Sequence, residues 1–337
     1  MTAVSMDNRR RNRYFLITGV LVAAAFIVSL LVGKYPISAR DIISFISGGG
    51  EGGISRSVFY TLRLPRTVMA LLLGAGLGMT GSVFQIIFKN PLAAPDVIGV
   101  SSGANLGAAV AIVFFGHSAA LMASSAFAFG MLAVVLVVAL VQLRSGSNAV
   151  AYILFGIIIR AVCESVIMLM KFSADPEKEL AAIEYWAMGS LGGVTSSKLA
   201  VVVPFFLVGF VGLILMRRHI MLLGLEDDES RALGVRVGLV RMIVLGFATL
   251  TVSSVICMTG LVFFVGLTAP HAARLALRKV SFAWCLLSAM VGALILLAAD
   301  CAARGISAAE IPVGIPTTFI GVPILLIFMI KRREGEV

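Results

Sequence analysis

Apolar runs of about 20 residues, separated by short polar segments, recur along the whole chain. The run at 14–32, "YFLITGVLVAAAFIVSLLV", carries no charge and is long enough to cross a bilayer as a helix. Such runs predict ten spans, near residues 14–33, 65–88, 93–115, 119–143, 149–171, 199–216, 238–257, 261–271, 281–300 and 316–330. The eighth is too short to cross alone as a regular helix. The pattern predicts an all-α polytopic membrane protein, with about ten transmembrane helices in a single domain over residues 1–337.

Composition and charge fit this membrane location. Hydrophobic residues make up 60% of the chain, its mean hydropathy is +1.05, and only 13% of residues are charged. When the loops alternate between the two sides, most of the 27 lysine and arginine residues fall beside the two termini, which predicts cytoplasmic termini. Lipid head groups beside the helix ends account for the net charge of +10 without a nucleic-acid partner. The basic residues at 9–13 precede a run too long for a cleavable signal peptide, so the first span is expected to remain.

The sequence offers no pattern for catalysis, metal binding or a cofactor. Its four cysteines form no C-x-x-C pair, its three histidines are scattered, and it has no Walker A motif. The letters "GLGMTG" at 76–81 match a dinucleotide fingerprint, but they lie within a predicted span. Gly74, Gly78 and Ser82 are spaced four apart, which instead predicts close packing of membrane helices. We expect a protein that is not an enzyme, with any ATP hydrolysis supplied by another chain.

Two segments in opposite halves of the chain are similar. "MTGSVFQIIFKNPLAA" at 79–94 and "MTGLVFFVGLTAPHAA" at 258–273 follow the second and seventh spans, so an inverted internal repeat is possible. Both copies place Pro and Gly where a helix is expected to break. Broken backbone at membrane depth is tolerated where protein or a water-filled cavity covers it, which favours a transport path over a passive scaffold.

Four consecutive carboxylates interrupt this apolar chain, at Glu226, Asp227, Asp228 and Glu229. Acidic residues favour a helix N-terminus, Asp227 and Arg231 have the spacing of an i,i+4 pair, and Gly234 is a plausible C-terminal stop. The stretch therefore predicts a short exposed helix of about two turns in a cytoplasmic loop. It is either a solvated loop helix without a partner or a docking element for a soluble protein.

Nearly the whole chain resembles one known family. The resemblance is carried by three segments, "RLPRTVMALLLGAGLGMTGSVFQIIFKNPLAAPDVIGVSSGA" at 63–104, "GLVFFVGLTAPHAARL" at 260–275 and "IPVGIPTTFIGVPILLIFMIKR" at 311–332. They are similar to the permease subunits of type II ABC importers for iron-siderophores, haem and cobalamin. The resemblance implies a bacterial or archaeal cell (inner) membrane and a dimer with a second permease subunit, most simply a homodimer. It also implies two ATPase subunits that bind Mg-ATP and an extracytoplasmic substrate-binding protein.

The same resemblance assigns expected roles to individual residues. A cytoplasmic loop at about 217–237 is expected to couple to the ATPase, with Glu226 where Gly is usual and Ser230 where Ala is usual. Outer loops are expected at about 34–62 and 172–198. The coupling residues implied are Leu225, Glu226, Asp227, Asp228, Glu229, Arg231, Leu233 and Gly234; the gate residues are Asn90 and Leu92; the binding-protein docking residues are Arg63, Arg66 and Arg304. By sequence alone, anchoring at helix ends beside the membrane interface is the favoured interpretation of these three arginines.

The fifth predicted span contains an ionisable pair at membrane depth. Arg160 and Glu164 are four residues apart, and in similar permeases this span lines the central pathway. Ionisable side chains inside a membrane are costly unless they are paired or face water. The pair is therefore either a structural ion pair or part of a polar pathway.

The function that follows is translocation of a metal chelate, with a ferric siderophore as the first expectation. Haem or cobalamin is the second within the same mechanism, and a metal oxyanion the third. From other classes, an ion-coupled secondary transporter and a non-transporting scaffold are the alternatives. Chelates of similar size are selected chiefly by the binding protein, so the sequence leaves both the chelate and the identity of the second permease subunit open.

Overall fold

The computed structural model describes residues 3–47, 53–116, 118–143, 149–277, 279–306 and 310–333. Helices dominate these residues, and they contain no strand, which confirms the all-α prediction. In chain order the elements are α1 (Ala3–Leu31), α2 (Ala39–Ile46), α3 (Ile54–Val58), η1 (Phe59–Arg63), α4 (Leu64–Ile87), η2 (Pro95–Ile98), α5 (Val100–Phe115), α6 (Ala119–Leu143), α7 (Ala149–Ser173), η3 (Pro176–Leu180), α8 (Ala181–Met188), α9 (Ser196–Leu215), α10 (Arg217–Leu223), α11 (Asp227–Ala232), α12 (Val237–Thr259), α13 (Val265–Ala276), α14 (Phe282–Gly305) and α15 (Gly314–Arg333).

Seven helical segments of the described chain are long and apolar enough to cross a membrane. They correspond to the first, second, fourth, fifth, sixth, seventh and ninth predicted spans. The shorter helices α5, α13 and α15 account for the other three. With 12 residues, α13 is about 18 Å long, too short to span alone, as its sequence predicts.

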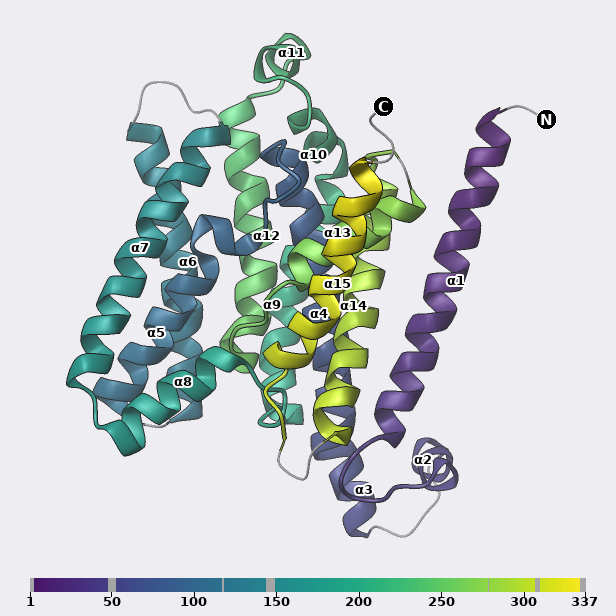
Figure 1. The fold of residues 1–337 in the computed structure, drawn as a ribbon, viewed down its shortest axis with the longest axis vertical. Helices are drawn as coiled ribbons and strands as arrows, with labels where there is room; N and C mark the ends of the chain where they lie inside the picture. The colour runs from purple at the N-terminus through teal and green to yellow at the C-terminus, as the bar shows by residue number, and fades with distance from the viewer. Residues whose placement is uncertain are drawn as a thin grey trace.

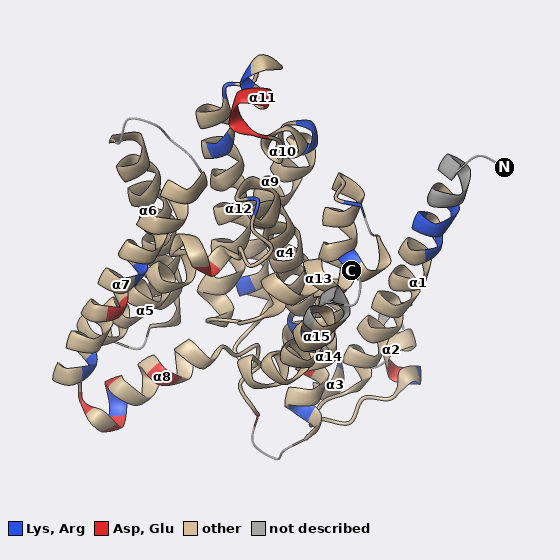
Figure 2. Ribbon diagram, turned by 45° about the horizontal axis from the view of Figure 1, so that its top comes forward, with Lys and Arg blue, Asp and Glu red and all other residues tan. Residues whose placement is uncertain are grey.

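The bundle has two distinct ends. Both chain termini, α10 and α11 lie at one end, which we call the terminal face, and α2, α3 and α8 lie at the other, the α8 face (Figure 1). Charged residues gather toward these two ends (Figure 2). Both termini therefore lie on one side, as an even number of spans requires, and the cytoplasmic assignment of that side remains a prediction.

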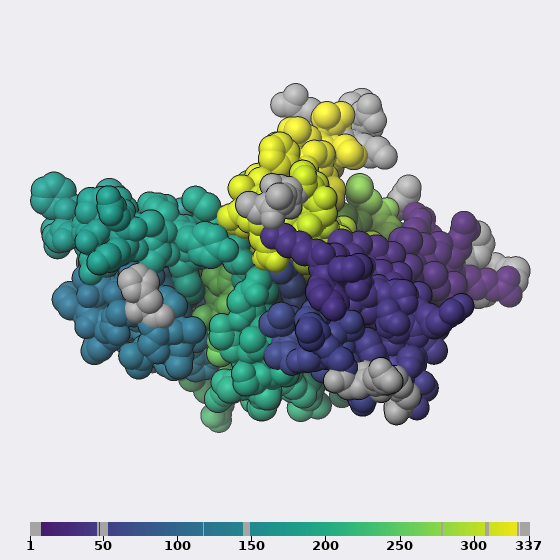
Figure 3. Space-filling model, turned by 90° about the horizontal axis from the view of Figure 1, so that it is seen from below, coloured from purple at the N-terminus to yellow at the C-terminus, as the bar shows by residue number. Residues whose placement is uncertain are grey.

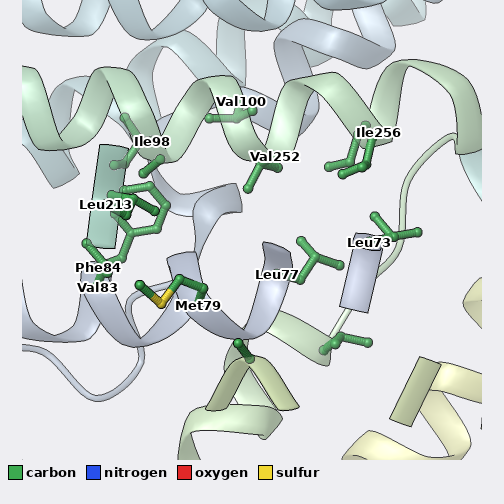
Figure 4. Packing of buried hydrophobic residues seen from close by; sticks show 14 of the residues in the cluster. Leu73, Leu77, Met79, Val83, Phe84, Ile98, Val100, Leu213, Val252 and Ile256 are labelled. Atoms are coloured by element: carbon green, nitrogen blue, oxygen red, sulfur yellow. The ribbon is translucent and has the colours of Figure 1, made fainter. Parts of the chain in front are cut away.

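Helix α4 forms the centre of the bundle, and α1 lies at its periphery. The most apolar stretch of the α3–α4 segment is 83% buried, whereas that of α1 is 11% buried. Leu77 of α4 lies toward Val252 of α12 inside the main hydrophobic cluster (Figure 4). A helix that is apolar on every face is stable only when its neighbours cover every face. The neighbours that cover α4 are α12, α13 and α14.

Small residues allow these neighbours to approach α4 closely. A Cβ added at Gly74 or Gly78 would overlap the backbone of α14, and one added at Gly81 would overlap the carbonyl oxygen of Gly266 in α13. The "GLGMTG" segment is thus a packing surface within α4, as predicted, with no strand before it.

The two similar segments do not occupy equivalent positions. Met79 lies well inside α4, whereas Met258 is the penultimate residue of α12. Both segments do contain breaks, with Lys89 and Phe264 in the left-handed region at φ values of 49° and 67°. The broken backbone is therefore confirmed, but this match gives no support for an inverted repeat.

Candidate functional site

The acidic stretch folds into the short helix α11, closed at both ends by its own residues. Glu226 is the N-cap, and Glu229 forms a reciprocal capping box with it. At the other end Gly234 has φ +82°, and its N–H and that of Val235 donate to the carbonyls of Arg231 and Ser230. These two bonds form a Schellman motif, so the predicted glycine stop is confirmed.

The predicted Asp227–Arg231 pair is wrong. Arg231 Nη1 instead lies 3.2 Å from Asp228 Oδ1, an i,i+3 pair on the surface. Asp227 turns inward, where the fully buried guanidinium of Arg241 on α12 donates to both its carboxylate oxygens, at 2.8 and 3.4 Å. Asp227 pairs with Arg241 and not with Arg231 because a bidentate charge-assisted bond to a buried guanidinium is stronger than an ion pair in solvent.

Lys89 joins α11 to the loop that follows α4. Its Nζ lies 3.1 Å from Glu226 and 4.0 Å from Asp227. The next residue, Asn90, accepts the backbone N–H of Leu92 at 2.9 Å, and the Leu92 side chain is exposed. The structure thus brings the predicted gate residues and the acidic helix together. Lys89 was missed as a site residue, although its position directly before Asn90 was a usable signal.

The outer surface of α11 combines charge with apolar side chains. Asp228, Glu229 and Arg231 are exposed, and so are Leu225 and Leu233. Ser230 is buried and donates to the carbonyl of Leu222 at 2.7 Å, which fixes α11 to α10. Exposed leucines beside an acidic patch suit contact with a soluble protein better than solvation alone (Figure 2).

A second region is a recess of about 590 Å³, which we call the hollow. Figure 3 shows the α8 face, where α7 and α8 form an arm beside α15. One wall, from η2, α5 and α7, is polar and includes Asp96, Ser101, Asn105, Arg160 and Glu164. The rest of the lining, from α8, the segment before α13 and α15, is mainly apolar and includes Met188, Leu261, Phe263, Ile315 and Phe319.

Arg160 and Glu164 form the predicted i,i+4 pair within the hollow. Arg160 Nε donates to Glu164 Oε1 at 2.7 Å, and the two side chains are 53% and 48% exposed. Because both line a recess and are half exposed, they are not buried between helices as a purely structural pair would be.

The three arginines expected to dock a binding protein are buried beneath the α8 face. Arg66 donates hydrogen bonds to Asp300 at 2.8 Å and Glu310 at 2.9 Å, while Arg304 Nη2 lies 2.7 Å from Asp300 Oδ2 as an ion pair. Arg63 donates to the carbonyls of Leu30 and Tyr35. In this arrangement the three arginines connect helices to one another. Their role in docking a binding protein stays a prediction.

Comparison with known proteins agrees with this architecture. A model of the FecCD transport family matches residues 21–331. The molybdate import system permease MolB of Haemophilus influenzae is 33% identical, over 95% of this chain and 96% of that protein. The ferric enterobactin transport system permease FepG of Escherichia coli is 33% identical, over 96% of this chain and 99% of FepG. A solved structure described as an inward-facing metal-chelate type ABC transporter has a TM-score of 0.83 at 31% identity, covering 95% of this chain and 99% of that one.

Proposed function

Because the chain belongs to the FecCD transport family, we propose that it is the membrane-spanning permease subunit of an ATP-driven importer. The observation that carries the proposal is the ion-paired link from exposed α11 through Lys89 to the loop holding Asn90 and Leu92. A partner that moves α11 would move this loop with it. The chain itself would bind no cofactor, and Mg-ATP would be bound by the partner.

Two routes lead from α11 into the bundle. One runs through Lys89 to the end of α4, and the other through Arg241 to α12 and to Tyr152 of α7, whose ring centroid lies 5.8 Å from the guanidinium carbon. Since α7 carries Arg160 and Glu164, the second route connects α11 with the helix that lines the hollow. Motion at the terminal face would thereby reach the transport path.

The proposed assembly contains two permease subunits, two ATPase subunits on the terminal face and a binding protein on the α8 face. The hollow is open beside α15 and α7, and a second copy facing it would complete a central path (Figure 3). The terminal face would be cytoplasmic and the membrane a bacterial or archaeal inner membrane.

The proposed cargo is a metal chelate, with a ferric siderophore first. The relatives' names include ferric enterobactin and molybdate, so a metal oxyanion is a second candidate, beside haem or cobalamin. An ion-coupled secondary transporter is the alternative mechanism, for which the charged pair in the hollow is the only argument.

The proposal is tested by reconstituting the chain with its ATPase and binding protein in liposomes. We expect uptake of a ferric chelate delivered by the binding protein to require ATP. Uptake should stop when the ATPase subunit is replaced by an inactive variant. Uptake driven by an ion gradient without ATP would instead establish the secondary transporter.

Docking on the α8 face gives a separate prediction. Glu310 forms an ion pair with the Arg66 guanidinium at 2.9 Å, and its side chain is 31% exposed. It would therefore compete for Arg66 with a carboxylate of the binding protein. Replacing Glu310 by glutamine is expected to raise binding-protein affinity several-fold at low salt and less at high salt, because rim charges are screened. Titration of the binding protein at two salt concentrations checks this.

The matched control is Glu177→Gln, an exposed carboxylate in η3 on the same face. It is expected to leave the affinity unchanged. Equal effects of the two substitutions would show that Arg66 takes no part in docking.

A further inference from the structure

A cavity of about 280 Å³, which we call the basic pocket, lies between the first turns of α1 and the start of α14. Its polar lining residues come from α1 and from the segment that joins α13 to α14, and they are Asn8, Arg10, Arg11, Lys279 and Ser281. Figure 2 shows the basic turns of α1 at the terminal face. The described lining contains three cations and no carboxylate, so the pocket attracts anions.

Two of these cations, Arg10 and Arg11, are both charged and accessible. Both residues are exposed, and a guanidinium stays protonated at every physiological pH. Neither has an ion-pair partner among the described residues, and Arg10 lies over the ring of Tyr14 with its guanidinium carbon 5.7 Å from the ring centroid. The start of the chain has an excess of positive charge, since Asp7 is the only acid in residues 1–13. The donors of both arginines can therefore bind an anion that enters the pocket.

The basic pocket lies at the depth of lipid head groups. Residues 14–31 of α1 are uncharged and about 27 Å long as a helix, close to the hydrocarbon thickness of a bilayer. Arg11 precedes Tyr14 by about 4.5 Å along the helix axis, within a head-group layer of about 5–8 Å. On the other side of the pocket, Lys279 and Ser281 come just before Phe282, where the span α14 begins. Both helices thus bring polar side chains to one level of the membrane.

An apolar flank of α1 continues from the pocket toward the centre of the membrane. Ile17 and Leu21 follow Arg10 at helical spacing, which places all three on the same flank. Ile17 and Leu21 are 40% and 47% exposed, and beside them Tyr14 packs against the main hydrophobic cluster. An acyl chain can cover this flank while its head group occupies the pocket.

The position of the pocket favours a lipid over an acidic segment of a soluble protein. Helix α11, with its exposed leucines and carboxylates, lies apart from α1 on the terminal face (Figure 1). The most apolar stretch of α1 is only 11% buried, the lowest value among the described spans. Lipid is therefore the neighbour that the exposed surface of α1 meets along its whole length.

We propose that the basic pocket binds an anionic phospholipid, whose phosphodiester accepts hydrogen bonds from Arg10 and Arg11 and whose acyl chains lie along α1. Phosphate oxygens match guanidinium donors, and basic pockets between helices at a membrane surface suit anionic head groups. A zwitterionic head group carries its own ammonium, which the same cations repel, so a net negative charge is preferred. The bound lipid would join α1 to α13 and α14. The site is independent of the cargo and of the ATPase.

Native mass spectrometry of the purified full-length chain tests this site. The chain in detergent receives equal amounts of phosphatidylglycerol and phosphatidylethanolamine with identical acyl chains, and the bound lipids are counted. We expect an apparent affinity for phosphatidylglycerol at least about fivefold higher than for phosphatidylethanolamine, since each arginine near the head group adds to the attraction. Arg10→Gln combined with Arg11→Gln is expected to remove most of this preference.

The matched control is Arg217→Gln combined with Arg218→Gln. It removes two exposed arginines at another helix end of the terminal face, outside the pocket, and should leave the preference unchanged. A preference that survives in the Arg10 and Arg11 variant overturns the proposal, and so does an equal loss in the control. If that double variant folds poorly, Arg11→Gln alone replaces it and should lower the preference by a smaller factor.

Competition and labelling establish what occupies the pocket. Glycerol 3-phosphate has the head group without acyl chains, so it should displace phosphatidylglycerol only weakly. Equal potency of the two would show a site for a free phosphate and contradict the lipid assignment. Displacement by the purified ATPase subunit would assign the pocket to a protein and also overturn it. Phosphatidylglycerol with a photoreactive acyl chain should label α1 near Ile17 and Leu21, whereas equal labelling of all spans would contradict a site beside α1.

Discussion

Replacing Asp300 by asparagine is expected to destabilise the folded chain by about 3–5 kcal/mol, the largest effect of any single substitution considered. Asp300 is fully buried and bonds two buried guanidiniums, those of Arg66 and Arg304. The amide that replaces it leaves Arg304 without a carboxylate partner among the described residues and Arg66 with only the partly exposed Glu310, and a desolvated cation without a counter-ion is the costly species. The measurement is the midpoint of thermal inactivation of the purified protein, together with its yield in membranes.

Glu310→Gln is the control for Asp300→Asn. Glu310 bonds the same Arg66 at 2.9 Å, but its side chain is 31% exposed, so solvent can replace the lost bond. A small shift of the midpoint is expected. A second variant that also replaces Arg304 by methionine should recover part of the loss, because it removes one of the uncompensated charges. Equal midpoints for Asp300→Asn and the unmodified protein would contradict this account of the network.

Replacing Asp227 by lysine is expected to lower transport by at least about tenfold, because it removes the ion pair that joins α11 to Arg241 of α12 and weakens the link through Lys89. The new ammonium would face the buried guanidinium of Arg241 and the nearby Lys89, so two attractive contacts become repulsive. ATP-driven uptake is measured at equal amounts of inserted permease. Co-purification of the ATPase is followed in parallel, and it should fall less than uptake does.

Asp228→Lys is the matched control, since it makes the same change one residue away. The Asp228 side chain is 94% exposed and pairs only with Arg231 on the surface, a contact worth about 0–1 kcal/mol. We expect uptake within a factor of about two of the unmodified protein. If both variants lose transport equally, charge on the outer surface of α11 is what matters, and the internal link through Asp227 is not the coupling route.

Features that depend on neighbouring residues could be predicted from the sequence. The spans followed from runs of about 20 apolar residues, because such runs are stable only where their surroundings are apolar. The acidic helix and its stop at Gly234 followed from capping, which involves residues three to five apart. The Arg160–Glu164 pair was predicted for the same reason, since one turn of a helix brings the two side chains together.

Contacts between distant segments were decided only by the tertiary structure. Arg66 and Asp300 are 234 residues apart, and no local pattern links them. Arg63, Arg66 and Arg304, which the sequence alone placed at helix ends, are buried and connect helices inside the bundle. Asp227 likewise forms its ion pair with Arg241 and not with its local neighbour Arg231, because a buried bidentate guanidinium binds a carboxylate more strongly than a solvated one does. Local periodicity sets which segments are helices, whereas the energies of desolvated charges depend on which helices meet, and that is a property of the packed bundle.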